Sequence, residues 1–362
     1  MENTVQTQLL DAFRAFEKVL PDIARTGIFS RSAQRYTGIN KHYRPIAEVV
    51  RKKRETADAV SLTLQLPEDF PASQAGEHID LAVEIRGVRH VRQYSIVSRE
   101  GSELQVTVKN QAGGLVSGFI HENIVVGSKI EISAPRGGFT LPVKAAKSYI
   151  FCSAGSGITP VFAMARELLA SGIKADVQFF HAAHSADAVI FRAELEHLAE
   201  RHNNFLPQFF LSEAEGVEKR RLNFATLQNL LGSELAGNET KVMLCGPGDF
   251  VKNLEEGFRS LGIQNIASEY YTLPSMPATT EAGQATFVRS RVEAPAAGNL
   301  LEAAEAAGLK PKHGCRRGIC HECKAHKKSG MVKNILSGQL TQGEENIQLC
   351  VSQAVGKVEI IL

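Results

Sequence analysis

The cysteine spacing near the C-terminus constrains this chain more than any other feature. Three of the six cysteines form the pattern C-x4-C-x2-C, and a fourth follows after 26 intervening residues. This is the plant-type spacing of a [2Fe–2S] cluster, in which one loop wraps the iron pair and a distant thiolate completes the site. Gly314 and Gly318 leave room in that loop for backbone N–H groups to approach the sulfurs. The expected metal ligands are Cys315, Cys320, Cys323 and Cys350.

A structural zinc site is the alternative use of these cysteines. Zinc usually takes two well-separated C-x2-C-like pairs, and a C-x4-C-x2-C triple is unusual for it. His313, His321 and His326 lie nearby, but a Rieske centre replaces two cysteines by two histidines, and all four cysteines are present here. We therefore expect these histidines to lie beside the cluster without ligating it.

The composition is that of an ordinary globular protein. Hydrophobic residues make up 43% and charged residues 22% of the chain, which excludes a largely disordered or collagen-like protein. The net charge of +2 provides no overall field that would favour nucleic acid. Apolar runs such as Ser148–Cys152 are far shorter than the roughly 20 residues needed for a transmembrane segment. The N-terminus lacks the basic start and apolar stretch of a secretion signal, so we expect a cytoplasmic protein.

The apolar pattern divides the chain into four units and a linker. Leu9, Phe13, Phe16 and Leu20 recur at helical spacing and predict an amphipathic helix in an N-terminal extension. Prolines and adjacent threonines after residue 272 indicate an exposed linker. The expected boundaries are 1–42 for the helical extension, 43–143 and 144–272 for two larger domains, 273–285 for the linker and 286–362 for the last domain.

The two larger domains show different periodicities. Short alternating runs in the first predict an antiparallel barrel or sandwich; they are Ala59–Leu66, Ile79–Ile85, Leu104–Val108 and Lys129–Ser133. In the second, strands and helices alternate, which predicts a parallel, doubly wound α/β sheet. The expected strands are Tyr149–Ser153, Ala175–His181, Phe209–Ser212 and Lys241–Cys245, with helices at Pro160–Leu169, Ala193–Arg201 and Leu222–Leu231 between them.

Two segments of the first large domain have the chemistry of a flavin site. Arg92, Tyr94 and Ser95 on one extended strand supply a cation for phosphate, a flat stacking surface and a hydroxyl donor. About twenty residues later, a glycine pair precedes a predicted helix, where backbone N–H groups can hold pyrophosphate. The residues of that turn proposed to bind the cofactor are Gly114, Leu115, Val116 and Ser117.

A second phosphate-binding turn follows the first strand of the α/β domain. Gly155 and Gly157 allow backbone amides to meet a pyrophosphate, and Pro160 suits a first helical turn. The motif departs from G-x-G-x-x-G because proline stands at the place of the third glycine. Thr159 in this turn, and Cys245, Gly246 and Pro247 at the end of a later strand, complete the candidate nicotinamide site.

Taken together, residues 43–362 resemble the ferredoxin-NADP-reductase-like flavoprotein family, with flavin, nicotinamide and ferredoxin motifs in the family's order. The resemblance implies an antiparallel β-barrel flavin domain, an α/β parallel-sheet nicotinamide domain and an α+β ferredoxin domain of the β-grasp type. R-x-Y-S followed by G-G-L-x-S resembles the FAD-binding version, whereas the FMN-binding branch usually differs at that turn. His321 departs from the family, since relatives often carry a small residue at its position.

The resemblance also implies roles for individual residues. Arg92 and Ser117 would contact phosphate, Tyr94 the flavin and ribityl region, and Ser95 the flavin N5 edge. Cys245 would lie beside the nicotinamide. Glu269 and one of the two tyrosines that follow it would lie near the flavin, and the sequence leaves open which tyrosine. The chemistry requires no catalytic acid–base pair or nucleophile, and we expect none.

These parts predict a reductase that passes electrons from NAD(P)H through FAD and a [2Fe–2S] cluster to a partner protein. The family implies a terminal oxygenase as the partner: a Rieske-type oxygenase, or a membrane diiron desaturase or hydroxylase. The N-terminal extension and Leu336-Ser337-Gly338 resemble the desaturase-linked group, which we rank first. Two alternatives remain: a zinc-stapled nucleotide-binding interaction module without redox activity, and a flavin reductase that needs no partner.

Charge suggests the type of nicotinamide and the nature of the partner surface. Glu213 would repel the 2′-phosphate of NADPH, which favours NADH, although Lys219, Arg220 and Arg221 follow in a loop that can reach it. Basic residues crowd the cluster loop and predict an acidic or mixed docking face on the electron acceptor. They are Lys310, Lys312, Arg316, Arg317, Lys324, Lys327 and Lys328.

Overall fold

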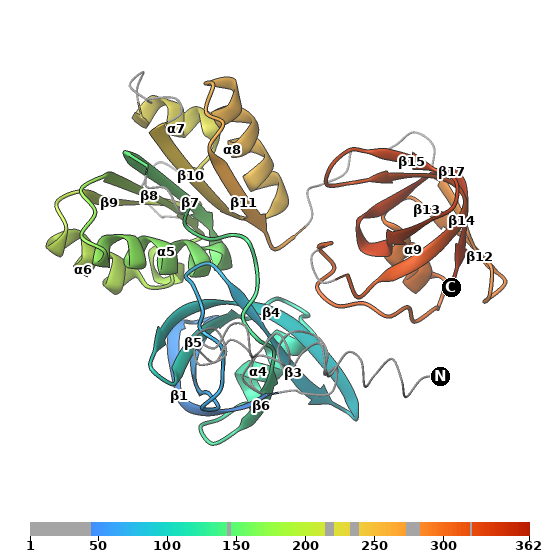
Figure 1. Cartoon of the computed structure of the whole chain (residues 1–362), viewed down its shortest axis with the longest axis horizontal. Helices are drawn as coiled ribbons and strands as arrows, with labels where there is room; N and C mark the ends of the chain where they lie inside the picture. The colour runs from blue at the N-terminus through green and yellow to red at the C-terminus, as the bar shows by residue number, and fades with distance from the viewer. Residues whose placement is uncertain (1–44, 143–145, 214–220, 232–238, 273–282, 319–320) are drawn as a thin grey trace, which may run out of the picture.

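The computed structural model describes residues 45–142, 146–213, 221–231, 239–272, 283–318 and 321–362. Within these ranges the chain folds into three bodies, each built on its own sheet (Figure 1). The helix expected in residues 1–42 lies outside the described part. In the described part, no helix is both long and apolar enough to cross a bilayer.

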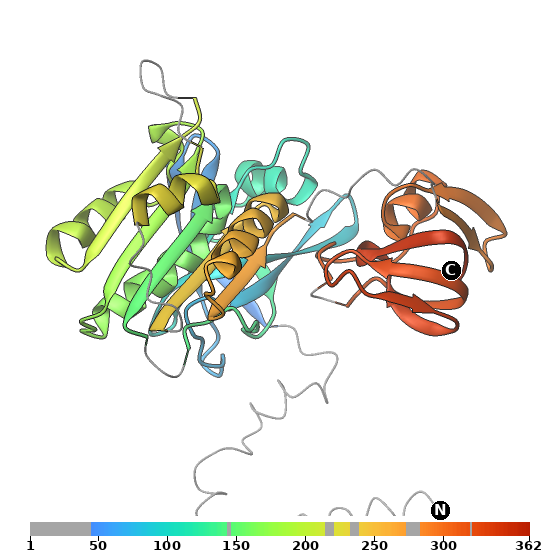
Figure 2. The ribbon, with the colours of Figure 1, turned by 90° about the horizontal axis from the view of Figure 1, so that it is seen from above.

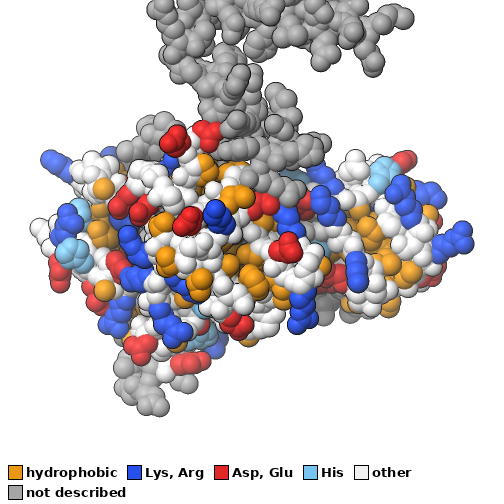
Figure 3. All heavy atoms as spheres, turned by 90° about the horizontal axis from the view of Figure 1, so that it is seen from below, with side chains coloured by type: hydrophobic (Ala, Val, Ile, Leu, Met, Phe, Trp, Pro, Cys, Tyr) orange, Lys and Arg blue, Asp and Glu red, His pale blue; other side chains and the backbone are white. Residues whose placement is uncertain are grey.

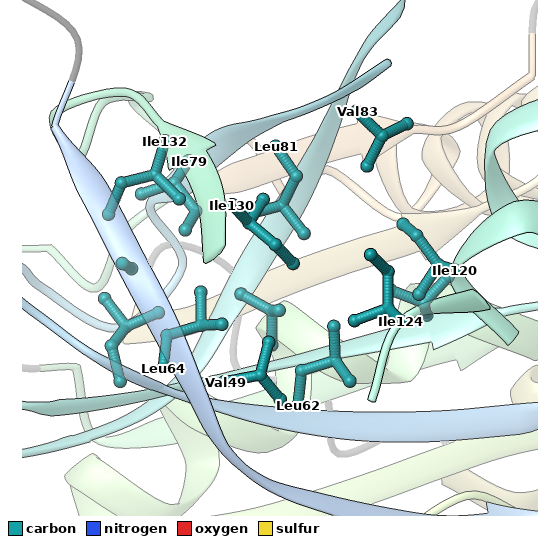
Figure 4. Packing of buried hydrophobic residues seen from close by; sticks show 14 of the residues in the cluster. Val49, Leu62, Leu64, Ile79, Leu81, Val83, Ile120, Ile124, Ile130 and Ile132 are labelled. Atoms are coloured by element: carbon teal, nitrogen blue, oxygen red, sulfur yellow. The ribbon is translucent and has the colours of Figure 1, made fainter. Parts of the chain in front are cut away.

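The first body is a closed, six-stranded antiparallel barrel, which confirms the barrel and not the sandwich. Its strand order is β1-β2-β5-β4-β3-β6. Alternate side chains of these strands fill the interior, where Leu62 and Leu64 meet Leu81 and Ile130, and Ile120 of the single helix lies at one end (Figure 4). The elements are β1 Ile46–Thr56, β2 Ala59–Gln65, β3 His78–Ile85, β4 Val88–Glu100, β5 Glu103–Lys109, α4 Leu115–Asn123 and β6 Lys129–Ile132.

The second body is the predicted parallel sheet, with strand order β11-β10-β7-β8-β9. Successive side chains of β7 face opposite layers: Phe151 packs under helices α5 and α6, and Ile150 packs under α7 and α8 (Figure 2). The strands are β7 Ser148–Ala154, β8 Asp176–Ala183, β9 Phe205–Leu211, β10 Thr240–Gly246 and β11 Ile266–Tyr270. The helices are α5 Ile158–Ala170, α6 Arg192–Arg201, α7 Phe224–Leu231 and α8 Gly248–Ser260.

The third body is a mixed six-stranded sheet packed against α9, the predicted α+β fold. Strands β13-β12-β17-β14-β15 follow in order, β16 pairs with β14, and β12 runs parallel to β17. Leu300 and Leu301 of α9 pack with Phe287 and Ile360 in the core. The elements are β12 Gly283–Phe287, β13 Val292–Ala296, α9 Leu300–Ala306, β14 Lys324–Asn334, β15 Leu340–Gln342, β16 Glu345–Gln348 and β17 Ser352–Ile361.

One boundary differs from the expected linker. Residues 283–285 belong to β12 and not to a connecting segment. Gly283 lies so close to Ala354 that an added Cβ would stand 2.6 Å from the Cβ of that alanine, and Ala285 is fully buried. Small residues therefore allow close strand packing here. Because small residues are also common in loops, composition alone does not distinguish the two.

Candidate redox site

The flavin motif lies on β4, where this strand pairs with β3 in the barrel wall. Tyr94 pairs with Ile79 and packs against the barrel core, and Ser95 pairs with His78. Burial raises the pKa of the Tyr94 phenol, so its hydroxyl stays protonated at neutral pH. Arg92, Tyr94 and Ser95 all line one cavity, which places the three predicted residues together.

The second half of the flavin motif is a tight turn that opens helix α4. Gly114 precedes the helix, and an added Cβ there would stand 2.5 Å from the Ser117 hydroxyl. That hydroxyl accepts a hydrogen bond of 3.1 Å from the Gln111 amide, so Ser117 stabilises the turn itself. Lys109 lines the same cavity beside the turn and adds a second cation that the sequence motif did not reveal. Leu115 and Val116 line it as well.

The nicotinamide turn joins β7 to α5 and touches the end of β10. A Cβ on Gly157 would overlap the carbonyl of Cys245, so only glycine permits this approach. The Thr159 hydroxyl donates to the Ser156 carbonyl at 3.0 Å and stabilises the turn. Gly157, Thr159 and Cys245 line the cavity. Gly155, Gly246 and Pro247 shape the adjoining backbone and are not among the lining residues.

The structure selects one of the two tyrosines after Glu269. Tyr271 lines the cavity, its amide donates to the Gly246 carbonyl at 3.1 Å and its hydroxyl to the Ala154 carbonyl at 3.3 Å. Tyr270 is not among the lining residues. Of the two tyrosines, Tyr271 is therefore the one that lies at the candidate flavin cavity.

All these groups meet in one cavity of about 320 Å³ that also includes a residue of the third body, Cys315. Two buried nitrogens of its lining, Nε2 of His78 and Nε2 of Gln93, have no hydrogen-bond partner among the described residues. Burial and the charges of Arg136 and Arg317 lower the pKa of His78 to about 4, so the imidazole is neutral. Unsatisfied buried donors call for a polar ligand, and a flavin ring with its ribityl chain fits this lining.

The fold brings two of the predicted metal ligands together in the ferredoxin domain. The sulfurs of Cys323 and Cys350 lie 3.2 Å apart, both residues are buried, and Cys315 accepts a hydrogen bond of 3.3 Å from the Arg317 amide. Two thiolates this close repel each other unless a cation lies between them. Cys320 lies outside the described residues.

Two of the neighbouring histidines hydrogen-bond to other groups of the chain. His313 hydrogen-bonds to the carbonyl of Pro311, and His326 to Glu344 at 2.8 Å. His321 adopts a left-handed backbone with φ 57°. This conformation favours glycine, which gives a physical reason for the small residue that relatives often carry there.

Most of the basic residues expected to form a docking face around the cluster loop are buried or pair with acidic residues of this chain. Lys327 is fully buried and pairs with Glu345 at 2.6 Å, and the Arg317 side chain is only 13% exposed. Including these two in an exposed docking face was wrong, because the charge pattern does not show which side chains turn inward. Others pair with acids on the surface: Lys312 with Glu322, Arg316 with Glu305 and Lys328 with Glu359. Acidic and basic side chains are interspersed on the face in Figure 3.

The region that distinguishes NADH from NADPH lies at the ends of β8 and β9. His184 Nδ1 lies 3.6 Å from the Glu213 carboxylate and 3.4 Å from the Ser212 hydroxyl, all on the surface. Arg221 is exposed, whereas Lys219 and Arg220 lie outside the described residues. The carboxylate is thus the charged group placed next to the strand ends.

Comparison with known proteins agrees with this division. Three family models match: the oxidoreductase FAD-binding domain over residues 46–141, the oxidoreductase NAD-binding domain over 151–256 and the 2Fe-2S iron-sulfur cluster binding domain over 286–355. An NADPH oxidoreductase of Mycobacterium tuberculosis is 32% identical, over 84% of this chain and 80% of its own length. The glycine betaine monooxygenase reductase subunit of Pseudomonas aeruginosa is 29% identical, over 79% and 86%.

The chain belongs to the ferredoxin-reductase-like family of modular flavin and iron–sulfur reductases. It carries FAD-, NAD(P)H- and [2Fe–2S]-binding domains and is an NAD(P)H-dependent oxidoreductase. The solved structure of phthalate dioxygenase reductase shares its fold, with a TM-score of 0.62 at 23% identity, over 88% of this chain and 98% of that one. The individual roles of the site residues remain predictions.

Arg92 provides a direct test of the flavin site. Replacing it by alanine should weaken FAD binding by roughly 10- to 100-fold, because a charge-assisted hydrogen bond to phosphate contributes about 1.5–3 kcal/mol. The measurement is titration of the apoprotein with FAD. Arg89→Ala is the matched control, since Arg89 lies on the same strand but pairs with Glu131 outside the cavity. Equal affinities for the two variants would exclude Arg92 from the phosphate site.

Proposed function

We propose that this chain is the reductase component of an oxygenase system, taking electrons from NADH and delivering them through FAD and the [2Fe–2S] cluster to the oxygenase. The single observation that carries the proposal is the shared cavity, whose lining includes Tyr94 of the barrel, Cys245 of the parallel sheet and Cys315 of the ferredoxin domain. When bound, FAD accepts a hydride from the nicotinamide and releases electrons singly, which matches a one-electron cluster.

The chain's own residues hold and orient the partners of this transfer. Arg92 and Lys109 supply positive charge for the pyrophosphate, next to the backbone turn at Gly114. The Gly157 turn brings the backbone of the nicotinamide domain against Cys245, so the nicotinamide would lie where the parallel strands end. Tyr271, fixed to that backbone by two hydrogen bonds, excludes water from the flavin face.

A terminal oxygenase is the electron acceptor that we propose. The name of the Pseudomonas aeruginosa relative, a monooxygenase reductase subunit, supports a monooxygenase partner. The desaturase-linked assignment rests on residues 1–42 and on Leu336-Ser337-Gly338, and the first of these lies outside the described residues. Because relatives are named as monooxygenase and N-demethylase reductase subunits, we rank a hydroxylating or demethylating oxygenase above a membrane desaturase. A cytoplasmic location is part of the proposal, and the buried Cys152 and Cys245, which form no disulfide, fit a reducing compartment.

We propose NADH as the physiological reductant. The Glu213 carboxylate is 69% exposed at the end of β9 and would accept hydrogen bonds from ribose hydroxyls but repel a 2′-phosphate. The proposal rests on this chain's own residues, because the name of the Mycobacterium tuberculosis relative specifies NADPH.

Removing one cluster ligand tests the proposed electron route. A Cys320→Ser variant should lose the cluster absorbance, keep the rate of flavin reduction by NADH, and reduce the oxygenase at less than a hundredth of the normal rate, on the order of the losses seen when a single essential group is removed. The assay is anaerobic flavin reduction followed by oxygenase turnover. A full rate of oxygenase reduction would contradict the route, and would favour a flavin reductase that needs no cluster.

Reversing the charge at Glu213 tests the choice of nicotinamide. Glu213→Arg should raise kcat/KM for NADPH relative to NADH by about tenfold or more, since an arginine–phosphate contact contributes about 1.5–3 kcal/mol. Glu200→Arg, at a similarly exposed carboxylate on α6, should leave the ratio unchanged. A wild-type protein that already prefers NADPH tenfold would contradict the assignment of NADH.

A further inference from the structure

One arginine of the cluster loop extends its side chain to the other two domains. Arg317 follows Cys315 in the loop, yet its NH1 donates to the Tyr270 carbonyl and its NH2 to the Gln93 side-chain oxygen, both at 3.0 Å. Tyr270 ends strand β11 of the parallel sheet, and Gln93 lies on strand β4 of the barrel. A single side chain therefore contacts both of the other domains.

The charge of Arg317 also has a partner across the domain boundary. Its NH1 lies 3.7 Å from the Glu269 carboxylate, and the two side chains are only 13% and 14% exposed. A guanidinium offers several donors in a fixed plane, which suits it to bind a carbonyl, an amide oxygen and a carboxylate together. Removing one partner of a contact this well buried leaves the other charge uncompensated.

The backbone of Arg317 contacts one of the predicted cluster ligands. The backbone amide of Arg317 donates to the Cys315 sulfur at 3.3 Å. Gln93 stands between Arg92 and Tyr94 on the flavin strand. One residue thus joins a cluster sulfur to the strand that lines the flavin cavity, which Cys315 itself enters.

Little else holds the ferredoxin domain in this place. In the described ranges, no strand or helix of that domain packs extensively against an element of the other two (Figure 2). A second cavity, of about 520 Å³, is lined by Tyr271 of the parallel-sheet domain and by Asn299 of the ferredoxin domain, so the interface is open there. The contacts of Arg317 are therefore important among the polar interactions that hold the ferredoxin domain against the other two domains.

The adjacent arginine provides a natural control. Arg316 turns back to its own domain, where NH1 donates to Glu305 of α9 at 2.9 Å. Its left-handed backbone, φ 58°, changes the chain direction between the two side chains. Of these two neighbouring arginines, Arg316 thus contacts its own domain and Arg317 contacts the other two domains.

We propose that Arg317 is a positioning residue that docks the ferredoxin domain on the flavin site and so controls the rate of electron transfer from flavin to cluster. It does not act in hydride transfer or in cluster assembly. The expected effect on the rate of electron transfer rests on the proposed electron route. The expected effect on the position of the ferredoxin domain rests on the interdomain contacts alone.

The kinetic experiment compares Arg317→Ala with Arg316→Ala in the full-length protein with both cofactors bound. After anaerobic mixing with NADH, flavin reduction should keep its rate in both variants. Cluster reduction should slow by about tenfold or more in Arg317→Ala only, because electron transfer depends on the docked geometry. Gln93→Ala should give a similar slowing from the other side of the contact, and combining it with Arg317→Ala should add little.

The structural experiment uses small-angle X-ray scattering on the same proteins. Arg317→Ala should give a larger radius of gyration and a broader distance distribution than wild type, whereas Arg316→Ala should match wild type. If Arg317→Ala assembles no cluster, Gln93→Ala tests the same contact without touching the cluster loop.

Three results would overturn the inference. They are equal cluster-reduction rates in the two arginine variants, equal loss of flavin and cluster reduction in Arg317→Ala, and unchanged scattering of both Arg317→Ala and Gln93→Ala. A wild-type cluster that NADH fails to reduce would instead refute the proposed route, and the scattering would still report on the docking.

Discussion

Electron transfer demands that its cofactors lie close together, and this demand governs how the three domains of the chain are placed. The ferredoxin domain has its own core, whereas Val97 and Phe139 of the barrel domain share a buried cluster with helix α5 of the parallel-sheet domain. What joins them at the site is a set of backbone turns and a few polar contacts. The hydrogen bonds from Arg317 to Tyr270 of the parallel sheet and to Gln93 of the barrel are the clearest examples.

In this arrangement, the residues that line the cofactor cavity are largely different from those that dock the ferredoxin domain. The residues that line the flavin cavity come mainly from the barrel and the parallel sheet, which pack together along α5 and β4. The ferredoxin domain contributes Cys315 and Arg317 from a single loop. A change in that loop can therefore alter delivery to the cluster while flavin and nicotinamide binding stay intact. Such independence suits a reductase whose ferredoxin domain must also meet a partner protein.

Much of this architecture could be predicted from the sequence because its signals are local. The alternation in β2 and β5, the strand–turn–helix at Gly155–Pro160 and the cysteine spacing each depend on neighbouring residues. The contacts between domains are not local. Arg317 looked like a surface charge, yet its hydrogen-bond acceptor Gln93 lies 224 residues away. Lys327 is buried because β14 pairs with β16, which brings Glu345 next to it. His78, Lys109 and Tyr271 likewise enter the site only through the folding of distant segments.

The central claim is that electrons reach the cluster only through the flavin held in the shared cavity. The most direct measurement removes FAD from the protein while the cluster is retained, and follows cluster absorbance after anaerobic addition of NADH. The account predicts no reduction of the cluster in the flavin-free protein and full recovery when FAD is added back. Reduction of the cluster by NADH in the absence of flavin, at the rate of the intact protein, would contradict it.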